Sequence, residues 1–310
     1  MPVSKTVVFL LILQVISTNP LYPEFSPETS QDPCKILFIG SSYFTFDDLP
    51  GLFKNLAETA GKEVSIDQYI VNGLYLSDHA SSEITEDKIN QDLWDYVILQ
   101  GVGSLTAYPE NMTDHPVYPS LITLRDKIKA NCNSTTMIFC LPWAFEDGMT
   151  WKDGWTDTYV EMQRIIYDHT LQYSHEIGFA VAPVGWAWNA VLEEKNYPTH
   201  YLHLSDWNHP SLEGSYLMAC VIFSTVYHEN ATGISYYSNL QAENAQYFQT
   251  IASTTVLTNL SLWNPDSLII HSGLPEHDSI TGIRLNSFWL FSFMGLGFIL
   301  FTLKKRFSNS

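Results

Sequence analysis

The sequence predicts a three-layer α/β/α sandwich built on a mainly parallel, five-stranded sheet. Two observations lead to this α/β fold class. Short segments that are almost continuously apolar recur from Lys35 onward, and longer stretches between them carry apolar residues at helical spacing. Strands covered by helices on both faces are expected to be apolar throughout, and regular alternation with helices is typical of a parallel sheet. The chain has 310 residues, which is enough for one domain with a large core.

The expected elements alternate in order along the chain. Strands are predicted at residues 35–40, 64–71, 95–100, 135–142 and 178–185. Helices are predicted at residues 49–60, 84–93, 119–130, 158–177, 211–227 and 240–258. Right-handed crossovers would place the loops that follow the strands at one edge of the sheet, where the active sites of such proteins lie.

Residues 1–17 have the layout of a secretory signal peptide. Lys5 precedes an apolar run from Val7 to Ile16, and the small residue Ser17 follows at a suitable cleavage position. A buried N-terminal strand is the alternative. A signal peptide would direct the rest of the chain out of the cytoplasm.

The other end of the chain carries a second apolar run. Residues 287–303 are uncharged and three cations follow them, which predicts a membrane-spanning helix and a cytoplasmic tail over residues 304–310. The body would lie outside, as a globular domain over residues 34–230 and a helix and stalk over residues 231–286. A buried terminal helix and a processed bacterial sorting signal are the alternatives.

The net charge of the chain is −18, and the two terminal segments, residues 1–17 and 284–310, hold five cations and no Asp or Glu, so the body carries a net charge of about −23. Such a body would not hold nucleic acid or an anionic lipid surface by electrostatics, and neutral substrates suit it better. Glycosylation sequons occur at Asn111, Asn133, Asn230 and Asn259. An even number of cysteines in an exported chain permits two disulfides among Cys34, Cys132, Cys140 and Cys220. A buried free thiol is equally compatible with Cys140, which ends an apolar strand.

Two polar segments carry the candidate chemistry. Ser41 and Ser42 follow the first expected strand, and a serine at a strand-to-helix turn can expose its hydroxyl and its own amide to the same space. Asp206 and His209 are three residues apart, so the carboxylate can reach Nδ1 of the imidazole and leave Nε2 to take a proton from a serine. Taken singly, each segment is also compatible with an ordinary turn or helix cap.

Together the two segments resemble the SGNH (GDSL-like) hydrolase superfamily, in the branch whose first block reads Gly-Asn-Ser-Tyr. GSSY at residues 40–43 occupies that block, and the Asp-x-x-His pair lies near the end of the matching region, which spans about residues 35–227. The resemblance implies a flavodoxin-like topology and an esterase without a cofactor. It also implies that Ser42 is the nucleophile, His209 the base and Asp206 the residue that orients the base.

The resemblance also implies an oxyanion hole made by the amides of Ser42 and Gly73. The third block of the family normally adds an asparagine side chain, but this sequence reads LQGVGS at residues 99–104. Because the loss of one donor typically slows such enzymes about 100- to 1000-fold, we expect the carboxamide of Gln100 to supply the missing donor.

Several aromatic and histidine side chains are further candidates for the site. Trp143, Trp186 and Trp188 follow the fourth and fifth expected strands, where indoles can stack on sugar rings or hold an acyl chain, although packing in the core is the alternative. His200 and His203 precede the Asp206 segment at spacings of three, but a loop that contains proline does not present a regular set of ligands, so no metal is expected.

The sequence therefore predicts a membrane-anchored serine esterase or deacetylase that acts outside the cytoplasm on a neutral ester, with acetylated glycans as candidates. A lipid esterase or phospholipase at the membrane surface is one alternative. A catalytically inactive surface protein that binds glycans is another. The expected partners are a small-molecule or glycan ester and the membrane, but no nucleic acid. The acyl chain, the leaving group and the oligomeric state are left open.

Overall fold

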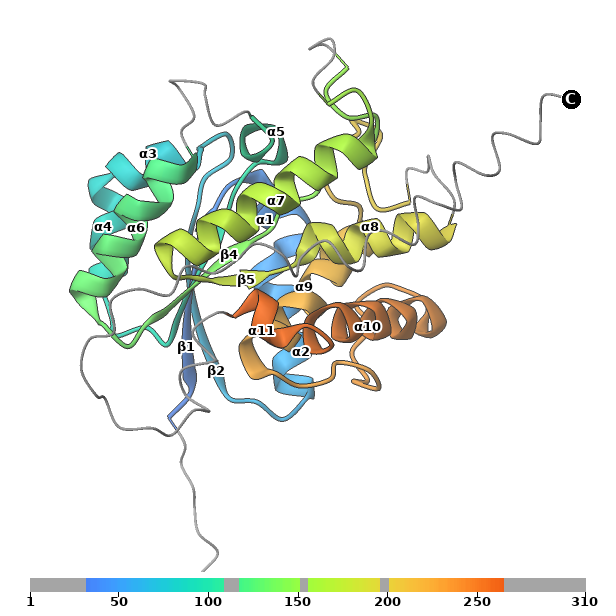
Figure 1. Ribbon diagram of the computed structural model, residues 1–310. Helices are drawn as coiled ribbons and strands as arrows, with labels where there is room; N and C mark the ends of the chain where they lie inside the picture. The colour runs from blue at the N-terminus through green and yellow to red at the C-terminus, as the bar shows by residue number, and fades with distance from the viewer. Residues whose placement is uncertain (1–31, 109–116, 151–155, 196–200, 265–310) are drawn as a thin grey trace, which may run out of the picture. The chain divides into compact units, whose positions relative to one another are not determined.

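The computed structural model describes residues 32–108, 117–150, 156–195 and 201–264 (Figure 1). The chain divides into two units, Met1–Leu268 and Ile269–Ser310, and all described residues belong to the first. Within them, one five-stranded sheet has the order β2-β1-β3-β4-β5, and every neighbouring pair is parallel. The strands are β1 (Cys34–Gly40), β2 (Val64–Ile70), β3 (Tyr96–Gln100), β4 (Thr136–Cys140) and β5 (Ala180–Ala182). The predicted fold class is confirmed.

The burial of each strand follows its place in the sheet. In β1, which lies between β2 and β3, every residue from Ile36 to Gly40 is buried. The edge strand β2 instead has the sequence VSIDQYI, and most of its residues are partly or fully exposed. A strand with neighbours on both sides and helices on both faces is buried and favours apolar side chains, so the more apolar segment occupies the interior position and the more polar one the edge.

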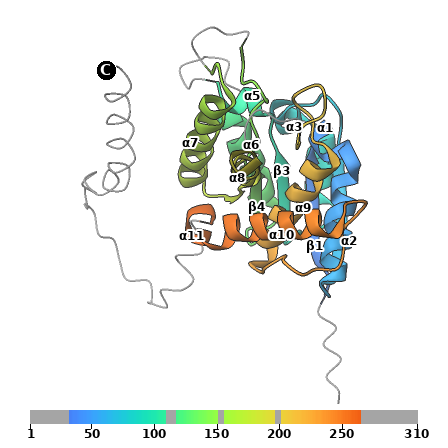
Figure 2. The ribbon, with the colours of Figure 1, turned by 90° about the vertical axis from the view of Figure 1, so that its right-hand side faces the viewer.

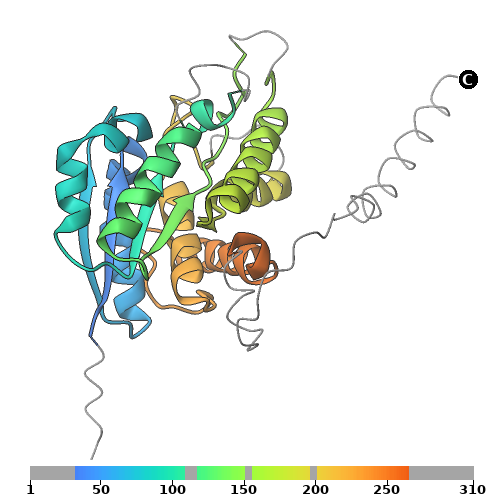
Figure 3. The same cartoon turned by 60° about the vertical axis from the view of Figure 1, so that its left-hand side comes forward.

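Helices cover both faces of the sheet (Figures 2 and 3). One face carries α2 (Leu49–Thr59) and α9 (Leu212–Tyr227), which pack against each other. The other face carries α6 (Val117–Asn131) and α7 (Tyr159–Ile177). This arrangement places α2, which follows the nucleophile segment, beside α9, which follows the histidine segment.

The helix expected near residues 240–258 is found as α10 (Ala242–Leu257) and belongs to the compact unit. It packs along α9, where an unbroken run from Gly214 to Val226 is buried. A helix can be apolar all round only when neighbours cover every side of it. The core therefore extends past residue 230, where the expected globular domain ends.

The remaining helices are mostly short. They are α1 (Ser42–Thr45), η1 (Phe46–Asp48), α3 (Leu76–Ser81), α4 (Glu83–Asn90), α5 (Gly103–Thr106), α8 (Val184–Lys195) and α11 (Leu260–Trp263). Sequence reasoning did not predict α8. Its start passes so close to the loop after β4 that a Cβ on Gly185 would lie 2.1 Å from the carbonyl oxygen of Pro142.

The predicted signal peptide, the predicted membrane helix and the sequon at Asn111 lie outside the described residues. No helix in the part of the chain that the structure describes is long and apolar enough to cross a membrane. The other three sequon asparagines are exposed.

The structure contains neither of the two expected disulfides: Cys34, Cys132, Cys140 and Cys220 are all free. Cys140 ends β4 and Cys220 lies in α9, and both are buried in the core, where burial raises the pKa of each thiol. Buried thiols of this kind act as small apolar side chains. The disulfide prediction is therefore corrected: Cys140 is the buried free thiol that its apolar strand also allowed.

Candidate active site

The nucleophile candidate lies at the end of β1, an interior strand of the sheet. β1 ends at Gly40, Ser41 caps the next helix, and Ser42 begins α1. A Cβ at Gly40 would lie 2.8 Å from the ring of Phe44 and 3.0 Å from Cβ of Gln100, so a side chain here would displace both. Ser42 is half-buried and therefore reachable from the edge of the sheet where the strands end.

Ser42, His209 and Asp206 form one hydrogen-bonded chain. Nε2 of His209 lies 2.9 Å from Oγ of Ser42, and Nδ1 of His209 lies 2.6 Å from Oδ2 of Asp206. A carboxylate only accepts hydrogen bonds, so Nδ1 carries the proton and Nε2 is left to accept one from Ser42. The two segments that the sequence singled out are 167 residues apart and meet here.

Asp206 is held as a charged acceptor. Its Oδ1 accepts hydrogen bonds from the backbone amides of Asn208 at 3.1 Å and His209 at 3.0 Å. Partial burial acts to raise the pKa of Asp206, but the hydrogen bonds from His209 and from the two amides together outweigh it and hold the pKa below its usual value. The carboxylate therefore stays ionised beside the imidazole at neutral pH.

The loop that carries these residues is anchored through Asn208. Its side-chain carbonyl accepts a hydrogen bond from the hydroxyl of Tyr43, and its backbone carbonyl accepts one from Nε1 of Trp143 at 2.8 Å. Burial, followed by the charge of Asp206, raises the pKa of Tyr43, so the phenol stays protonated and donates. Tyr43, which follows Ser42, thus holds Asn208, which precedes His209.

No protein-family model and no curated protein matches this sequence. Solved structures do match it. A DUF4886 family protein from Bacteroides uniformis aligns with a TM-score of 0.60 and 19% identity, over 73% of this chain and 95% of that chain. A protein from Slackia heliotrinireducens assigned as an SGNH hydrolase aligns with a TM-score of 0.51 and 21% identity, over 63% of this chain and 100% of that chain. This chain has the SGNH-hydrolase fold. The fold that the sequence resemblance implied is therefore confirmed.

Gln100 occupies a different place in this SGNH fold from the one expected for an oxyanion donor. Its Oε1 accepts hydrogen bonds from the amide and the hydroxyl of Ser41, at 2.9 and 3.1 Å, and its Nε2 donates to the carbonyl of Gly101. The side chain is buried beneath the turn. Because both ends of the carboxamide are engaged within the protein, Gln100 supports the turn that carries Ser42.

Gly73, the other expected oxyanion donor, follows β2 with a φ of +83°, in the left-handed region that favours glycine. The loop around it lies beside α1, because Thr45 Oγ1 donates a hydrogen bond of 2.6 Å to the side chain of Asn72. The loop is exposed. The contribution of the Gly73 and Ser42 amides to an oxyanion hole stays a prediction.

Two of the three expected substrate-stacking tryptophans are in the core. Trp143 and Trp188 are almost completely buried and stack on each other with ring centroids 4.2 Å apart, and Tyr43 stacks on the other face of Trp143 at 4.5 Å. Buried indoles cannot meet a substrate, so this expectation is wrong for both; they support the floor under the site. Trp186 is partly buried and packs against Tyr167, with ring centroids 4.2 Å apart.

Two residues that sequence reasoning missed contact the site. Phe46 stacks on the imidazole of His209, with ring centroids 4.5 Å apart. His79 is buried in α3, and its Nε2 lies 3.0 Å from the carbonyl oxygen of Gly40. Phe46 could have been found from the sequence, because it follows Ser42 by four residues, about one helical turn. Nothing in the sequence distinguished His79 from an ordinary helix residue.

The histidines before Asp206 do not gather around it. Nε2 of His203 lies 3.0 Å from the carbonyl oxygen of Ala144, inside the core, and His200 lies outside the described residues. Among the residues that the structure describes, no three His, Cys, Asp or Glu side chains are arranged to hold a metal ion.

Proposed function

We propose that this protein is a serine carboxylic ester hydrolase. The observation that supports it most strongly is the hydrogen-bonded chain from Ser42 through His209 to Asp206. Such a chain activates a serine for attack on a carbonyl carbon, and the same order of groups recurs on unrelated hydrolase folds.

In the proposed mechanism, Oγ of Ser42 attacks the ester carbonyl while Nε2 of His209 takes its proton. Asp206 holds the imidazole in the required tautomer and stabilises the imidazolium. The imidazolium then protonates the leaving alkoxide, which departs as an alcohol and leaves an acyl-enzyme. Water, deprotonated by His209, attacks the acyl group and releases the acid and free Ser42.

We further propose that the protein acts outside the cytoplasm and is tethered to a membrane. This proposal depends on the sequence of residues 1–17 and 287–310, with their apolar runs and flanking cations. The acidic composition of the body, with a net charge of −18 for the chain, favours neutral substrates.

The test is hydrolysis of p-nitrophenyl acetate by the full chain, purified in mild detergent, beside Ser42→Ala and His209→Gln. We expect each variant to lose at least about 1000-fold in kcat, because the members of such a triad act as a unit. His175→Gln, which changes an exposed histidine of α7, is the matched control and should keep the wild-type rate.

Labelling by a fluorophosphonate gives a second measurement that does not depend on the choice of ester. We expect mass spectrometry to find the label on Ser42 in the wild type and no label in Ser42→Ala or His209→Gln. A chain that neither hydrolyses the ester nor takes the label would contradict the proposed activity and favour a glycan-binding surface protein.

A further inference from the structure

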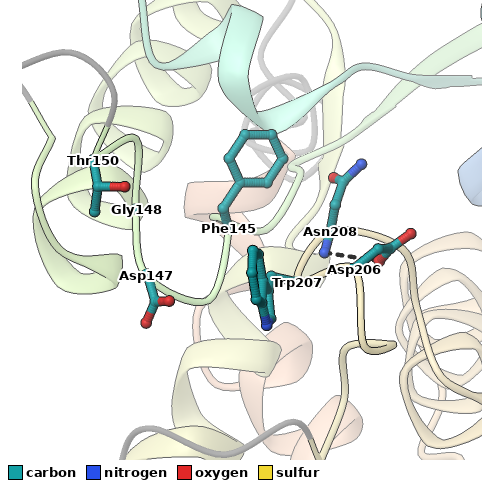
Figure 4. Close-up of a pocket in the computed structure, with 7 residues that line it drawn as sticks. All are labelled: Phe145, Asp147, Gly148, Thr150, Asp206, Trp207 and Asn208. Carbon is teal, nitrogen blue, oxygen red and sulfur yellow. Dashed lines mark hydrogen bonds between the residues drawn. The ribbon is translucent and has the colours of Figure 1, made fainter.

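A pocket of about 270 Å³ lies beside the triad, between the loop after β4 and the loop that carries Asp206 (Figure 4). Phe145, Asp147 and Thr150 line it from the first loop, and Asp206, Trp207 and Asn208 line it from the second. Asp206 thus faces His209 with one oxygen and forms part of this pocket. The pocket therefore adjoins the carboxylate end of the triad, from which His209 leads to Ser42.

The walls of the pocket are fixed by backbone contacts. The amide of Glu146 donates to the carbonyl of Trp207 at 3.1 Å and joins the two loops. Gly148 has a φ of +71°, and a Cβ there would lie 2.5 Å from the carbonyl oxygen of Thr156, so the turn packs tightly against the chain behind it. Met149 adds a backbone hydrogen bond to the same carbonyl at 2.7 Å. A pocket with such walls is preformed, as small-molecule sites usually are.

Trp207 is unusual in two ways: its indole is exposed, and its backbone adopts a left-handed conformation. The residue is 53% exposed, although most indoles in proteins are covered. Its φ is +62°, in the left-handed region that bulky residues rarely adopt. The hydrogen bond from its amide to Leu204 and the one from Glu146 to its carbonyl hold this conformation. A strained residue that presents a large apolar ring at the edge of a pocket points to a binding role.

The chemistry of the lining selects among possible occupants. Phe145 and Trp207 offer aromatic surface, and Asp147 and Thr150 offer a carboxylate and a hydroxyl as hydrogen-bonding groups (Figure 4). A long acyl chain would strip water from Asp147 without giving it a partner. An anionic group would be repelled by Asp147 and Asp206. A neutral sugar ring has both an apolar face and hydroxyl donors.

We propose that this pocket binds the sugar ring of a neutral glycan ester whose acyl group is cleaved at Ser42. The proposal rests on the proposed ester hydrolase function and assigns its substrate class. In it, Trp207 stacks on the apolar face of the ring and Asp147 accepts hydrogen bonds from the ring hydroxyls. The volume of about 270 Å³ suits a single ring, since pockets for drug-sized ligands start at about 300 Å³.

The test compares kcat/KM for a monoacetylated methyl xyloside, which keeps two free ring hydroxyls, with kcat/KM for p-nitrophenyl acetate in Trp207→Gly. Glycine accepts a positive φ, so this variant removes the indole without straining the loop. We expect the ratio of the two values to fall about tenfold, the loss typical of one well-placed aromatic contact. Trp207→Phe, which keeps a ring face, should recover most of the ratio. Ser238→Gly changes another positive-φ residue, outside the pocket, and should leave the ratio unchanged.

An unchanged ratio in Trp207→Gly would contradict the proposal. The proposal would also be contradicted if Trp207→Gly lowered kcat/KM for p-nitrophenyl octanoate relative to p-nitrophenyl acetate and left the ratio for the sugar ester unchanged. That result would identify an acyl pocket. Binding of the monoacetylated methyl xyloside to Ser42→Ala, measured by saturation-transfer NMR, separates the pocket from the reaction. We expect this signal to weaken when Trp207→Gly is added. Failure of the wild type to hydrolyse either ester would contradict the proposed function alone, because this binding signal would persist.

Discussion

Phe46 stacks on the imidazole of His209, with ring centroids 4.5 Å apart and ring planes at 27°. Phe46 begins η1, one turn after Ser42, so a single short segment carries the nucleophile and covers the base. The face of an aromatic ring attracts a cation, and the imidazole becomes cationic when it takes the proton of Ser42. The contact is therefore stronger in the transition state than in the resting enzyme.

Replacing Phe46 by leucine should lower kcat with little change in KM. The expected loss is about two- to fivefold, because an exposed cation–π contact contributes about 0.5–1 kcal/mol. Phe46→Tyr keeps the ring face and should stay close to the wild type. The measurement is steady-state hydrolysis of p-nitrophenyl acetate, with urea unfolding to compare stability. Equal kcat values for the leucine variant and the wild type would rule out this role.

Replacing Gln100 by leucine should lower both stability and activity. The amide of Ser41 would lose its buried acceptor, which costs about 1–3 kcal/mol of unfolding free energy. The turn that carries Ser42 would loosen and kcat would fall with it. Gln100→Glu keeps the acceptor and should be less destabilised. A loss of kcat with unchanged unfolding free energy in Gln100→Leu would instead favour the oxyanion-donor role.

The burial of His79 should make the free energy of unfolding depend on pH near pH 6. Burial lowers the pKa of His79, and the hydrogen bond to Gly40 and the charge of Asp78 only partly oppose this. As pH falls below about 6.5, His79 takes up a proton in the unfolded chain but stays neutral in the folded chain. Stability contributed by the neutral imidazole is therefore lost between about pH 6.5 and the lowered folded pKa.

The variant His79→Gln isolates this effect. Its amide can still donate to the carbonyl of Gly40, but it cannot titrate. We expect it to be less stable than the wild type at pH 7.5 and to lose less stability between pH 7.5 and pH 5.5, as measured by urea unfolding. The difference between the two curves removes the contributions of the other histidines. Parallel curves would show that His79 takes up its proton equally in both states.

Cys132 should be the most reactive cysteine. Hydrogen bonds from Ser134 and Thr135 lower its pKa to about 7, whereas partial burial and the charge of Asp95 raise the pKa of Cys34 to about 11. Because the thiolate is the reacting form, iodoacetamide at pH 7.5 should label Cys132 first in the native protein, as read by peptide mass spectrometry. Cys132→Ser should remove the fast phase. A native protein without any reactive thiol would indicate disulfides instead.

The sequence was most informative where the evidence is local. The runs at residues 35–40 and 95–100 are mostly apolar, and they form the interior strands β1 and β3 within one residue of their predicted ends. The resemblance that rested on residues 40–43 and 206–209 implied the fold that the solved structures share. Sequence reasoning missed α8, because its first two residues, Val184 and Gly185, were assigned to the predicted strand 178–185 and VGWAWNAV has no polar face to mark a helix.

By itself, the sequence determined the order of the five strands and of most long helices, and the three residues of the candidate triad, because periodicity and short motifs are properties of neighbouring residues. Only the tertiary structure decided which way the side chains point. Trp143 turns inward and donates to the backbone of Asn208, a residue 65 positions away, whereas Trp207 in the same loop as Asn208 turns outward. Burial depends on contacts between segments that are distant in the chain, and a pattern within one segment does not contain them.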